Sequence, residues 1–261
     1  MPLTLCLILL SLFGLAASAA ATDSDGTQPQ GRSEYSTLQM NLCLSGLAGC
    51  YAGTRYPAVV DEAIAKIRAT GADAVTLNEA CSGDVERIAR ETGYDHAFAT
   101  VIYGGAPLPC RDPGERGVFG NAVLTRDDIT SAEGGPYQAQ TGPEQRRWIC
   151  VTTPADTRVC TSHLGVAGTR DQAATNDAQC AELAEVLARG DQATLFGGDV
   201  NRQASCAPSH AWTDRDEEAA QAPGIQHVYG TSPGLVRPRD EVLPMSHSDH
   251  DALLVHALLR P

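Results

Sequence analysis

The segment Thr194-Leu-Phe-Gly-Gly-Asp-Val-Asn201 constrains the fold of this chain more than any other stretch. An apolar run leads into two glycines, and Asp199 and Asn201 follow at once. Because residues two apart in a strand project from the same face, a strand ending here places a carboxylate and a carboxamide side by side. That pair suits phosphate chemistry, and the glycines let backbone and ligand approach closely. For this segment alone, the alternative is a buried strand running into an ordinary Asx-rich turn.

The N-terminal 20 residues are almost wholly apolar and carry no charged side chain. The run Leu3 to Leu15 is followed by Ala17-Ser18-Ala19, which predicts a secretory signal peptide over residues 1–19, cut after Ala19. Residues 20–34 are polar and rich in Gly, Pro and Ser, which predicts a disordered lead-in. No linker divides residues 35–261, so we expect one secreted, extracellular domain there.

The cysteine count supports export. Of nine cysteines, Cys6 lies in the signal and eight remain, an even number that favours disulfides over metal or redox sites. Eight cysteines allow about 105 connectivities. We expect sequence neighbours to pair, as Cys43–Cys50, Cys81–Cys110, Cys150–Cys160 and Cys180–Cys206.

Hydrophobic patterning predicts strands alternating with helices in the first half and a hairpin in the middle. The expected strands cover residues 36–43, 74–77, 96–103, 118–124, 148–152, 158–162, 194–196, 225–229 and 252–259, and the expected helices cover 56–70, 82–93 and 169–190. Such an order indicates a mixed, layered α/β structure.

Polar groups stand at the edges of several of these strands. They are Asn41, Glu79, His163, Asp199 with Asn201, and Ser248-Asp249-His250. Each is ordinary alone, since a strand-end Asn is usually a turn residue, a single Glu a solvated charge and a single His structural. Together they supply oxygen ligands for a divalent cation, two imidazoles for proton transfer and an amide for transition-state charge.

These stretches resemble the ordered motifs of the endonuclease/exonuclease/phosphatase superfamily. They are Gln39-Met-Asn41, Leu77-Asn-Glu79, Gly120-Asn-Ala-Val-Leu-Thr125, Thr161-Ser-His163, Gly198-Asp-Val-Asn201 and Ser248-Asp-His250. The resemblance implies a four-layer α/β sandwich, with two packed mixed β-sheets flanked by helices. It also implies hydrolysis of phosphate esters with Mg²⁺ or a similar ion, as in pancreatic-type deoxyribonucleases, abasic-site endonucleases, inositol-polyphosphate phosphatases and bacterial sphingomyelinases.

The same resemblance assigns a metal site. It makes Glu79 the main ligand, with Asn41 beside it and Asp249 a further candidate. Oxygen ligands of this kind suit Mg²⁺, Mn²⁺ or Ca²⁺ better than zinc.

The catalytic roles are implied in the same way. His163 and His250 flank the scissile phosphate, Asp199 positions or deprotonates the attacking water, and Asn201 hydrogen-bonds the developing charge on phosphorus. The choice of general base between Asp199 and His250 stays open.

One position departs from the family pattern. Gln226 stands where relatives usually carry an aspartate that orients the last histidine. A glutamine oxygen accepts a hydrogen bond but gives no charge stabilisation to an imidazolium. Either His250 is a weaker base here, or Asp251 or Glu241 replaces the aspartate, or catalysis is partly impaired.

Charge bears on the substrate. A net charge of −13 repels polyanions unless a basic patch or a bound metal overcomes the field. The rim arginines would be Arg111, Arg116, Arg146 and Arg147, although a solvated surface is the ordinary role of such residues. We expect a monomeric, metal-dependent phosphodiesterase without stable membrane insertion, acting on extracellular nucleic acid. The alternatives are a phospholipid or small phosphate-ester hydrolase, and a catalytically silent binding domain.

Overall fold

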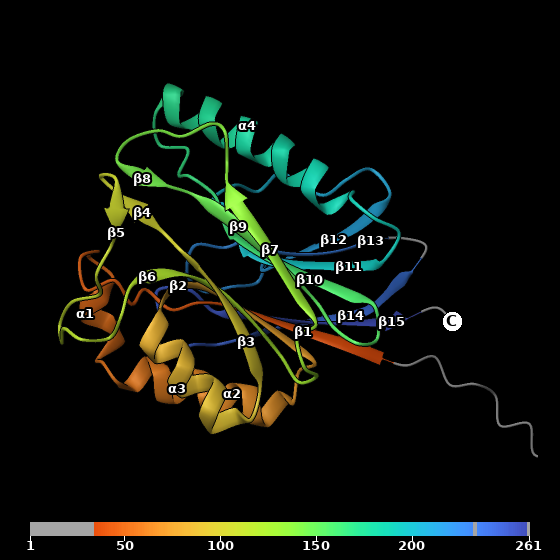
Figure 1. Cartoon of the computed structure of the whole chain (residues 1–261), viewed down its shortest axis with the longest axis horizontal. Helices are drawn as coiled ribbons and strands as arrows, with labels where there is room; N and C mark the ends of the chain where they lie inside the picture. Colours follow the sequence, from red (N-terminus) through yellow and green to blue (C-terminus); the bar gives the residue numbers. More distant parts are fainter. Residues whose placement is uncertain (1–33, 232–233, 260–261) are drawn as a thin grey trace, which may run out of the picture. The chain divides into compact units, whose positions relative to one another are not determined.

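Two six-stranded β-sheets lie face to face between helices (Figure 1). The computed structural model describes residues 34–231 and 234–259, all within the unit Arg32–Pro261. The predicted signal peptide, and the lead-in up to residue 33, lie outside the described residues. Within those residues, no helix is both long and apolar enough to span a membrane.

The first sheet has the strand order β14-β15-β1-β2-β6-β3. Its strands are β1 (Glu34–Asn41), β2 (Ala74–Cys81), β3 (Asp95–Thr100), β6 (Phe119–Thr125), β14 (Leu235–Leu243) and β15 (Ala252–Leu259). β1 is parallel to β2 and antiparallel to β15, so the sheet is mixed. The helices on its outer side are α1 (Tyr51–Thr54), α2 (Ala58–Thr70) and α3 (Ser82–Thr92).

The second sheet has the order β12-β13-β11-β10-β9-β7. Its strands are β7 (Ser131–Pro136), β9 (Arg147–Thr152), β10 (Thr157–His163), β11 (Ala193–Asp199), β12 (Ala211–Arg215) and β13 (Gln226–Thr231). Helix α4 (Arg170–Leu187) covers its outer side. The predicted four-layer α/β sandwich is therefore confirmed. A small third sheet joins β4 (Ile102–Tyr103), β5 (Ala106–Pro107) and β8 (Glu144–Gln145).

Strand alternation decides which side chains face the space between the sheets. In β1, Leu38 and Met40 pack in the cluster under the helices, so Gln39 and Asn41 point to the other sheet. In β11, Phe196 packs in the cluster shared with α4, while Leu195 packs between the sheets. The inner face of the sandwich is therefore apolar at one end and polar at the other.

The three main strands that the hydrophobic pattern did not predict all lie at sheet edges. They are β7, β12 and β14. β7 reads Ser-Ala-Glu-Gly-Gly-Pro and is almost wholly exposed, and β14 carries charged residues and a proline. Edge strands are protected from aggregation by charges, Gly and Pro, and this removes the alternating apolar signal.

All four predicted disulfides form. Cys43 bonds Cys50, Cys81 bonds Cys110, Cys150 bonds Cys160 and Cys180 bonds Cys206. Cys150 and Cys160 are directly paired across the antiparallel strands β9 and β10, as the hairpin pattern indicated. The disulfides indicate folding in an oxidising compartment.

Removing the Cys180–Cys206 disulfide by a double substitution to Ala is expected to lower the free energy of unfolding by about 3.5 kcal/mol, because the bond closes a long loop. The two cysteines are 26 residues apart in Cys180–Cys206 and 7 residues apart in Cys43–Cys50. Removing Cys43–Cys50 is therefore expected to lower the free energy of unfolding by about 1 kcal/mol less. Urea unfolding of the two double variants measures this difference. A larger loss for the short loop would contradict the loop-closure explanation.

Candidate active site

The polar groups predicted from strand ends meet at one edge of the sandwich. β10 and β11 are parallel and place His163 directly opposite Asp199. The Oδ2 atom of Asp199 lies 3.7 Å from Nε2 of His163, 3.8 Å from Nε2 of His250 and 3.1 Å from Nδ2 of Asn41. Three residues that are remote from one another in the chain therefore surround one buried carboxylate oxygen.

Glu79 reaches this edge through a β-bulge. Asn78 faces the other sheet and bonds Thr161, so strict alternation would turn Glu79 towards the helices. The pairing of β2 with β6 shifts between Leu77 and Ala80, and Glu79 has φ +53°. A bulge with a left-handed residue redirects the side chain, so Glu79 points into the site.

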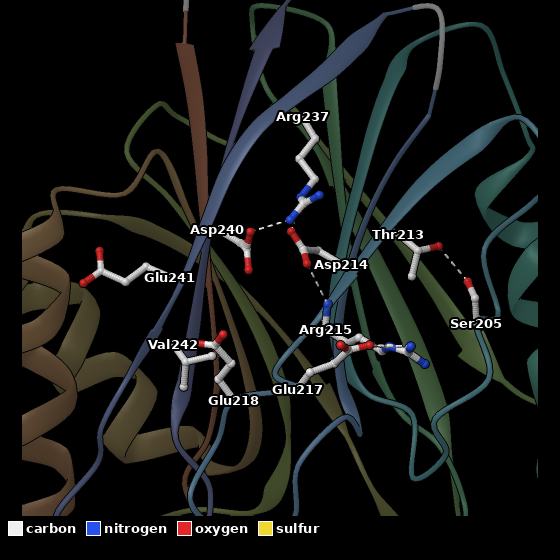
Figure 2. Close-up of a pocket in the computed structure, with 10 residues that line it drawn as sticks. All are labelled: Ser205, Thr213, Asp214, Arg215, Glu217, Glu218, Arg237, Asp240, Glu241 and Val242. Carbon is white, nitrogen blue, oxygen red and sulfur yellow. Dashed lines mark hydrogen bonds and ion pairs between the residues drawn. The ribbon is translucent and has the colours of Figure 1, made fainter.

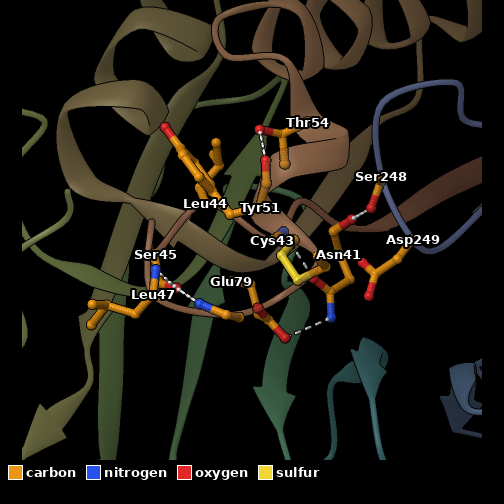
Figure 3. Close-up of a disulfide and its surroundings, with 12 residues drawn as sticks. Asn41, Cys43, Leu44, Ser45, Leu47, Tyr51, Thr54, Glu79, Ser248 and Asp249 are labelled. Carbon is orange, nitrogen blue, oxygen red and sulfur yellow. Dashed lines mark hydrogen bonds between the residues drawn. A yellow bond between two sulfur atoms is a disulfide. The ribbon is translucent and has the colours of Figure 1, made fainter. Parts of the chain in front are cut away.

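The loop that carries Asp249 and His250 is tied to both neighbouring elements. Ser248 Oγ donates to the carbonyl of Asn41 at 2.6 Å (Figure 3). It also accepts from the backbone N–H of His250 at 3.3 Å. On the α2 side, Glu62 lies 2.9 Å from Nδ1 of His247 and accepts its backbone N–H. His247 thus anchors the loop to a helix.

Burial and one arginine set the charges of the site. Burial raises the pKa of Glu79 to about 7 and raises the pKa of Asp199, while the cation of Arg146 opposes both shifts. Burial, then Arg146 and His250, hold the pKa of His163 well below its usual value. His163 is therefore neutral at physiological pH, and Glu79 is a carboxylate that a cation would stabilise.

Asn41, which the family resemblance placed beside Glu79 at the metal, forms hydrogen bonds to both acidic side chains. Its Nδ2 donates to Oε1 of Glu79 at 3.2 Å and to Oδ2 of Asp199 at 3.1 Å, while its Oδ1 accepts from the N–H of Cys43 at 3.2 Å. Two carboxylates need a donor between them, and this fixes the amide orientation. Asn41 therefore bridges two acidic groups.

Asn201, which the family resemblance assigned to the charge developing on phosphorus, contacts His163 and Leu164 in this structure. Its Nδ2 lies 2.9 Å from Nε2 of His163 and 2.9 Å from the carbonyl of Leu164. Because the carbonyl accepts one N–H, the second N–H donates to the imidazole, whose proton then resides on Nδ1. Asn201 positions His163 in one tautomer, and its φ of +52° permits this geometry.

No substitute acid orients His250. Among the described residues, its buried Nδ1 has no hydrogen-bond partner. Both carboxylate oxygens of Asp251 accept backbone N–H groups, from Met245 and Ala220, and Glu241 lies exposed at a cavity elsewhere. Of the alternatives drawn from the sequence, replacement by Asp251 or Glu241 is wrong.

Gln226 instead joins a buried amide network between the sheets. Its Oε1 accepts from Nε2 of Gln39 at 3.2 Å, and Gln39 donates to Oδ1 of Asn78 at 2.9 Å. The same Asn78 oxygen accepts the backbone N–H of Asp199 at 2.7 Å. Gln226 also donates to the fully buried carboxylate of Asp216 at 3.3 Å. The network holds the strand that carries Asp199.

Gln226→Asp alone is expected to lower the free energy of unfolding by about 3 kcal/mol, because a second buried carboxylate would face Asp216. Burial already raises the pKa of Asp216 to about 6. The double variant Gln226→Asp with Asp216→Asn removes the repulsion and should recover most of that loss. Urea unfolding of the single and double variants provides the test, and a single variant as stable as the parent would refute the repulsion.

The two glycines before Asp199 serve packing. A Cβ on Gly197 would lie 2.2 Å from Oγ1 of Thr76 in the facing sheet, and one on Gly198 would lie 2.3 Å from the carbonyl of Ser162. Gly197 therefore lets the two sheets approach closely, and Gly198 lets the neighbouring strand β10 of the same sheet do so.

The donor set fits a hard divalent cation. Glu79 offers a buried carboxylate, and Oδ1 of Asp249 is buried without a hydrogen-bond partner. In the described ranges, one group of three potential ligand residues has its ligand atoms within 4.8 Å of one another. It consists of Glu79 with Cys43 and Cys50, whose sulfur atoms are bonded to each other (Figure 3). One or two carboxylates, completed by water and substrate oxygens, is the usual way in which proteins bind Mg²⁺.

The four arginines considered from the sequence have different positions. Arg116 is buried and pairs with Asp84 at 2.9 Å, so it is structural. Arg111 and Arg146 line a cavity with Glu79 and His163, and Arg147 lines a different one. Of the four arginines, Arg111 and Arg146 therefore lie beside the candidate site.

Another cavity, of about 810 Å³, is lined by other residues (Figure 2). It is formed between β12 and β14 and includes Asp214, whose carboxylate pairs with Arg237. None of the predicted site residues lines it.

Comparison with known proteins defines the class. The model of the Endonuclease/Exonuclease/phosphatase family matches residues 48–250, and the chain belongs to this family. It is a phosphoester hydrolase of the phosphodiesterase type found there. Comparison with curated protein sequences found no match.

Solved structures show the same fold at low sequence identity. A family protein from Beutenbergia cavernae is 19% identical, with TM-score 0.66 over 87% of this chain and 72% of that chain. The catalytic domain of human Nocturnin with bound sulfate is 13% identical, with TM-score 0.67 over 87% and 94%. TDP2 from D. rerio, complexed with a single-strand DNA product, is 13% identical, with TM-score 0.61 over 86% and 99%.

Proposed function

We propose that this protein is a secreted phosphodiesterase that hydrolyses nucleic acid with the help of a divalent cation, most suitably Mg²⁺. The observation that carries the proposal is the group around Asp199, whose Oδ2 lies within 3.8 Å of both imidazoles. Partly buried Arg146 adds a cation beside Glu79 and His163, which attracts a phosphate into an otherwise acidic chain. The DNA product held by the D. rerio relative supports nucleic acid as the substrate.

The residues divide the chemistry among themselves. Asp199 or His250 accepts a proton from the attacking water, since their side chains adjoin. Neutral His163, held by Asn201, presents its Nδ1–H as a hydrogen-bond donor. Glu79 and Asp249 would hold the cation, which neutralises charge on the phosphoryl oxygens. Arg146 contributes a permanent positive charge to the same region.

Export belongs to the same proposal. The disulfides support an oxidising location, and residues 1–19 would direct secretion of the single domain 35–261 as a monomer.

Product release by the disulfide-intact protein tests the proposed substrate. The substrates are plasmid DNA, single-stranded DNA, sphingomyelin vesicles and bis(4-nitrophenyl) phosphate, each with Mg²⁺ and with chelator. Chelator-sensitive cleavage of DNA is the expected result. Cleavage of sphingomyelin or the small ester alone would replace nucleic acid as the substrate, and no turnover at all would favour a silent scaffold.

A further inference from the structure

A cavity of about 520 Å³ opens directly beside the catalytic groups. Glu79 and His163 form one end of it. Its remaining walls are largely apolar, with Arg111 and Arg146 at the side, and the apolar residues are Leu47, Ala48, Tyr103, Leu108 and Phe119. Both the size and the apolar lining are typical of a site that binds a small organic group.

Two of these apolar side chains are unusually exposed. In the part of the chain that the structure describes, the exposed large hydrophobic residues are Leu47, Tyr103 and Val166, with exposed fractions of 51%, 47% and 46%. Leu47 and Tyr103 line the cavity, while Val166 lies at a neighbouring one. Large apolar side chains left open around a reactive site indicate contact with a ligand.

The cavity walls are held rigid by two disulfides. Leu47 lies inside the loop closed by Cys43–Cys50 (Figure 3), and Arg111 follows Cys110, which bonds Cys81. The two loops also touch, since the backbone N–H of Arg111 donates to the carbonyl of Ser45 at 3.0 Å.

Gly46 makes this contact sterically feasible. It has φ +75°, and a Cβ there would lie 2.3 Å from the carbonyl oxygen of Arg111. The cavity is therefore shaped before a ligand binds, which reduces the entropy cost of binding.

Two arginines, Arg111 and Arg146, and two carboxylates, those of Glu79 and Glu144, line the cavity. Arg146 pairs with Glu144 at 3.2 Å. Among the described residues, no carboxylate lies within 4.0 Å of the Arg111 guanidinium, the limit for an ion pair. The guanidinium is therefore free to bind an anion such as phosphate. Because Arg146 is paired, Arg111 is the cation that would repel the fixed positive charge of a choline headgroup. An aromatic base flanked by phosphates matches both the apolar wall and the cations.

We propose that this cavity binds one unstacked nucleobase and its sugar next to the scissile phosphate, with Arg111 contacting the adjoining phosphate. The proposal rests on the proposed function and specifies its substrate as a single-stranded polynucleotide. A base inside a duplex remains stacked, so it cannot enter such a cavity without the cost of unstacking.

Calorimetry with adenosine 5′-monophosphate and with ribose 5-phosphate, in Mg²⁺, separates the base from the phosphate. The base is expected to strengthen binding about tenfold. Leu47→Ser and Tyr103→Ala should each remove most of that gain without changing ribose 5-phosphate binding. Val166→Ser is the matched control, since Val166 is equally exposed but lies outside the cavity, and it should behave as the parent.

The outcomes separate this subsite from the proposed function. Equal binding of the two ligands, no binding of either, or equal losses in Val166→Ser would overturn the subsite. A parallel assay compares cleavage of single-stranded and duplex DNA. We expect the single strand to be cleaved about tenfold faster, and Arg111→Gln to reduce this difference. DNA cleavage unaffected by the cavity variants would refute the subsite and retain the function. Base-dependent binding without any DNA cleavage would support the subsite and refute the proposed function.

Discussion

Glu79→Gln is expected to lower kcat/KM for a phosphodiester by about 10³-fold in Mg²⁺, because it removes a cation-binding carboxylate while preserving side-chain shape. The Asn41 hydrogen bond to Glu79 survives this change, since Oε1 remains an acceptor. Calorimetric Mg²⁺ titration should show weaker binding, alongside the loss of rate with bis(4-nitrophenyl) phosphate.

Glu217→Gln is the matched control for this variant. Glu217 lines the large cavity between β12 and β14, remote from the site, and its substitution should leave the rate unchanged. Circular dichroism establishes that both variants are folded. Full activity in folded Glu79→Gln would show that Glu79 does not hold the cation.

Asp199→Asn is expected to reduce kcat by about 10³-fold with little change in KM, because the variant cannot accept a proton from water. Burial raises the pKa of Asp199 above its ordinary 3.8. The group must be ionised to act as a base, so activity of the parent should fall as the pH drops through this raised pKa. A pH–rate profile of kcat measures this acid limb, which the variant should lack in its residual activity.

The comparison of Asp199→Asn with His250→Asn decides which group is the base. If His250→Asn keeps the acid limb and Asp199→Asn loses it, Asp199 is the base; the reverse pattern assigns the role to His250. Asp128→Asn, in the exposed turn between β6 and β7, controls for the loss of one surface charge. A parent-like rate in Asp199→Asn would remove Asp199 from the mechanism.

Hydrophobic periodicity predicted the interior strands of both sheets and missed three of the four edge strands. β1, β2, β10 and β11 bury one or both faces, so their apolar residues recur at strand spacing. β7 and β14 lie at sheet edges, where exposed faces accept Gly, Pro and charged residues. Disulfide partners were predictable because sequence neighbours lie across short loops or adjoining elements.

The sequence by itself determined the fold class, the disulfide pairs and the set of polar residues at the site. The ends of β1, β10 and β11 bring Asn41, His163 and Asp199 to one edge. The tertiary structure alone decided what each group does, because hydrogen-bond orientation depends on neighbours remote in the chain. The carboxylates of Glu79 and Asp199 turn the amide nitrogen of Asn41 towards them, and the carbonyl of Leu164 turns that of Asn201 towards His163.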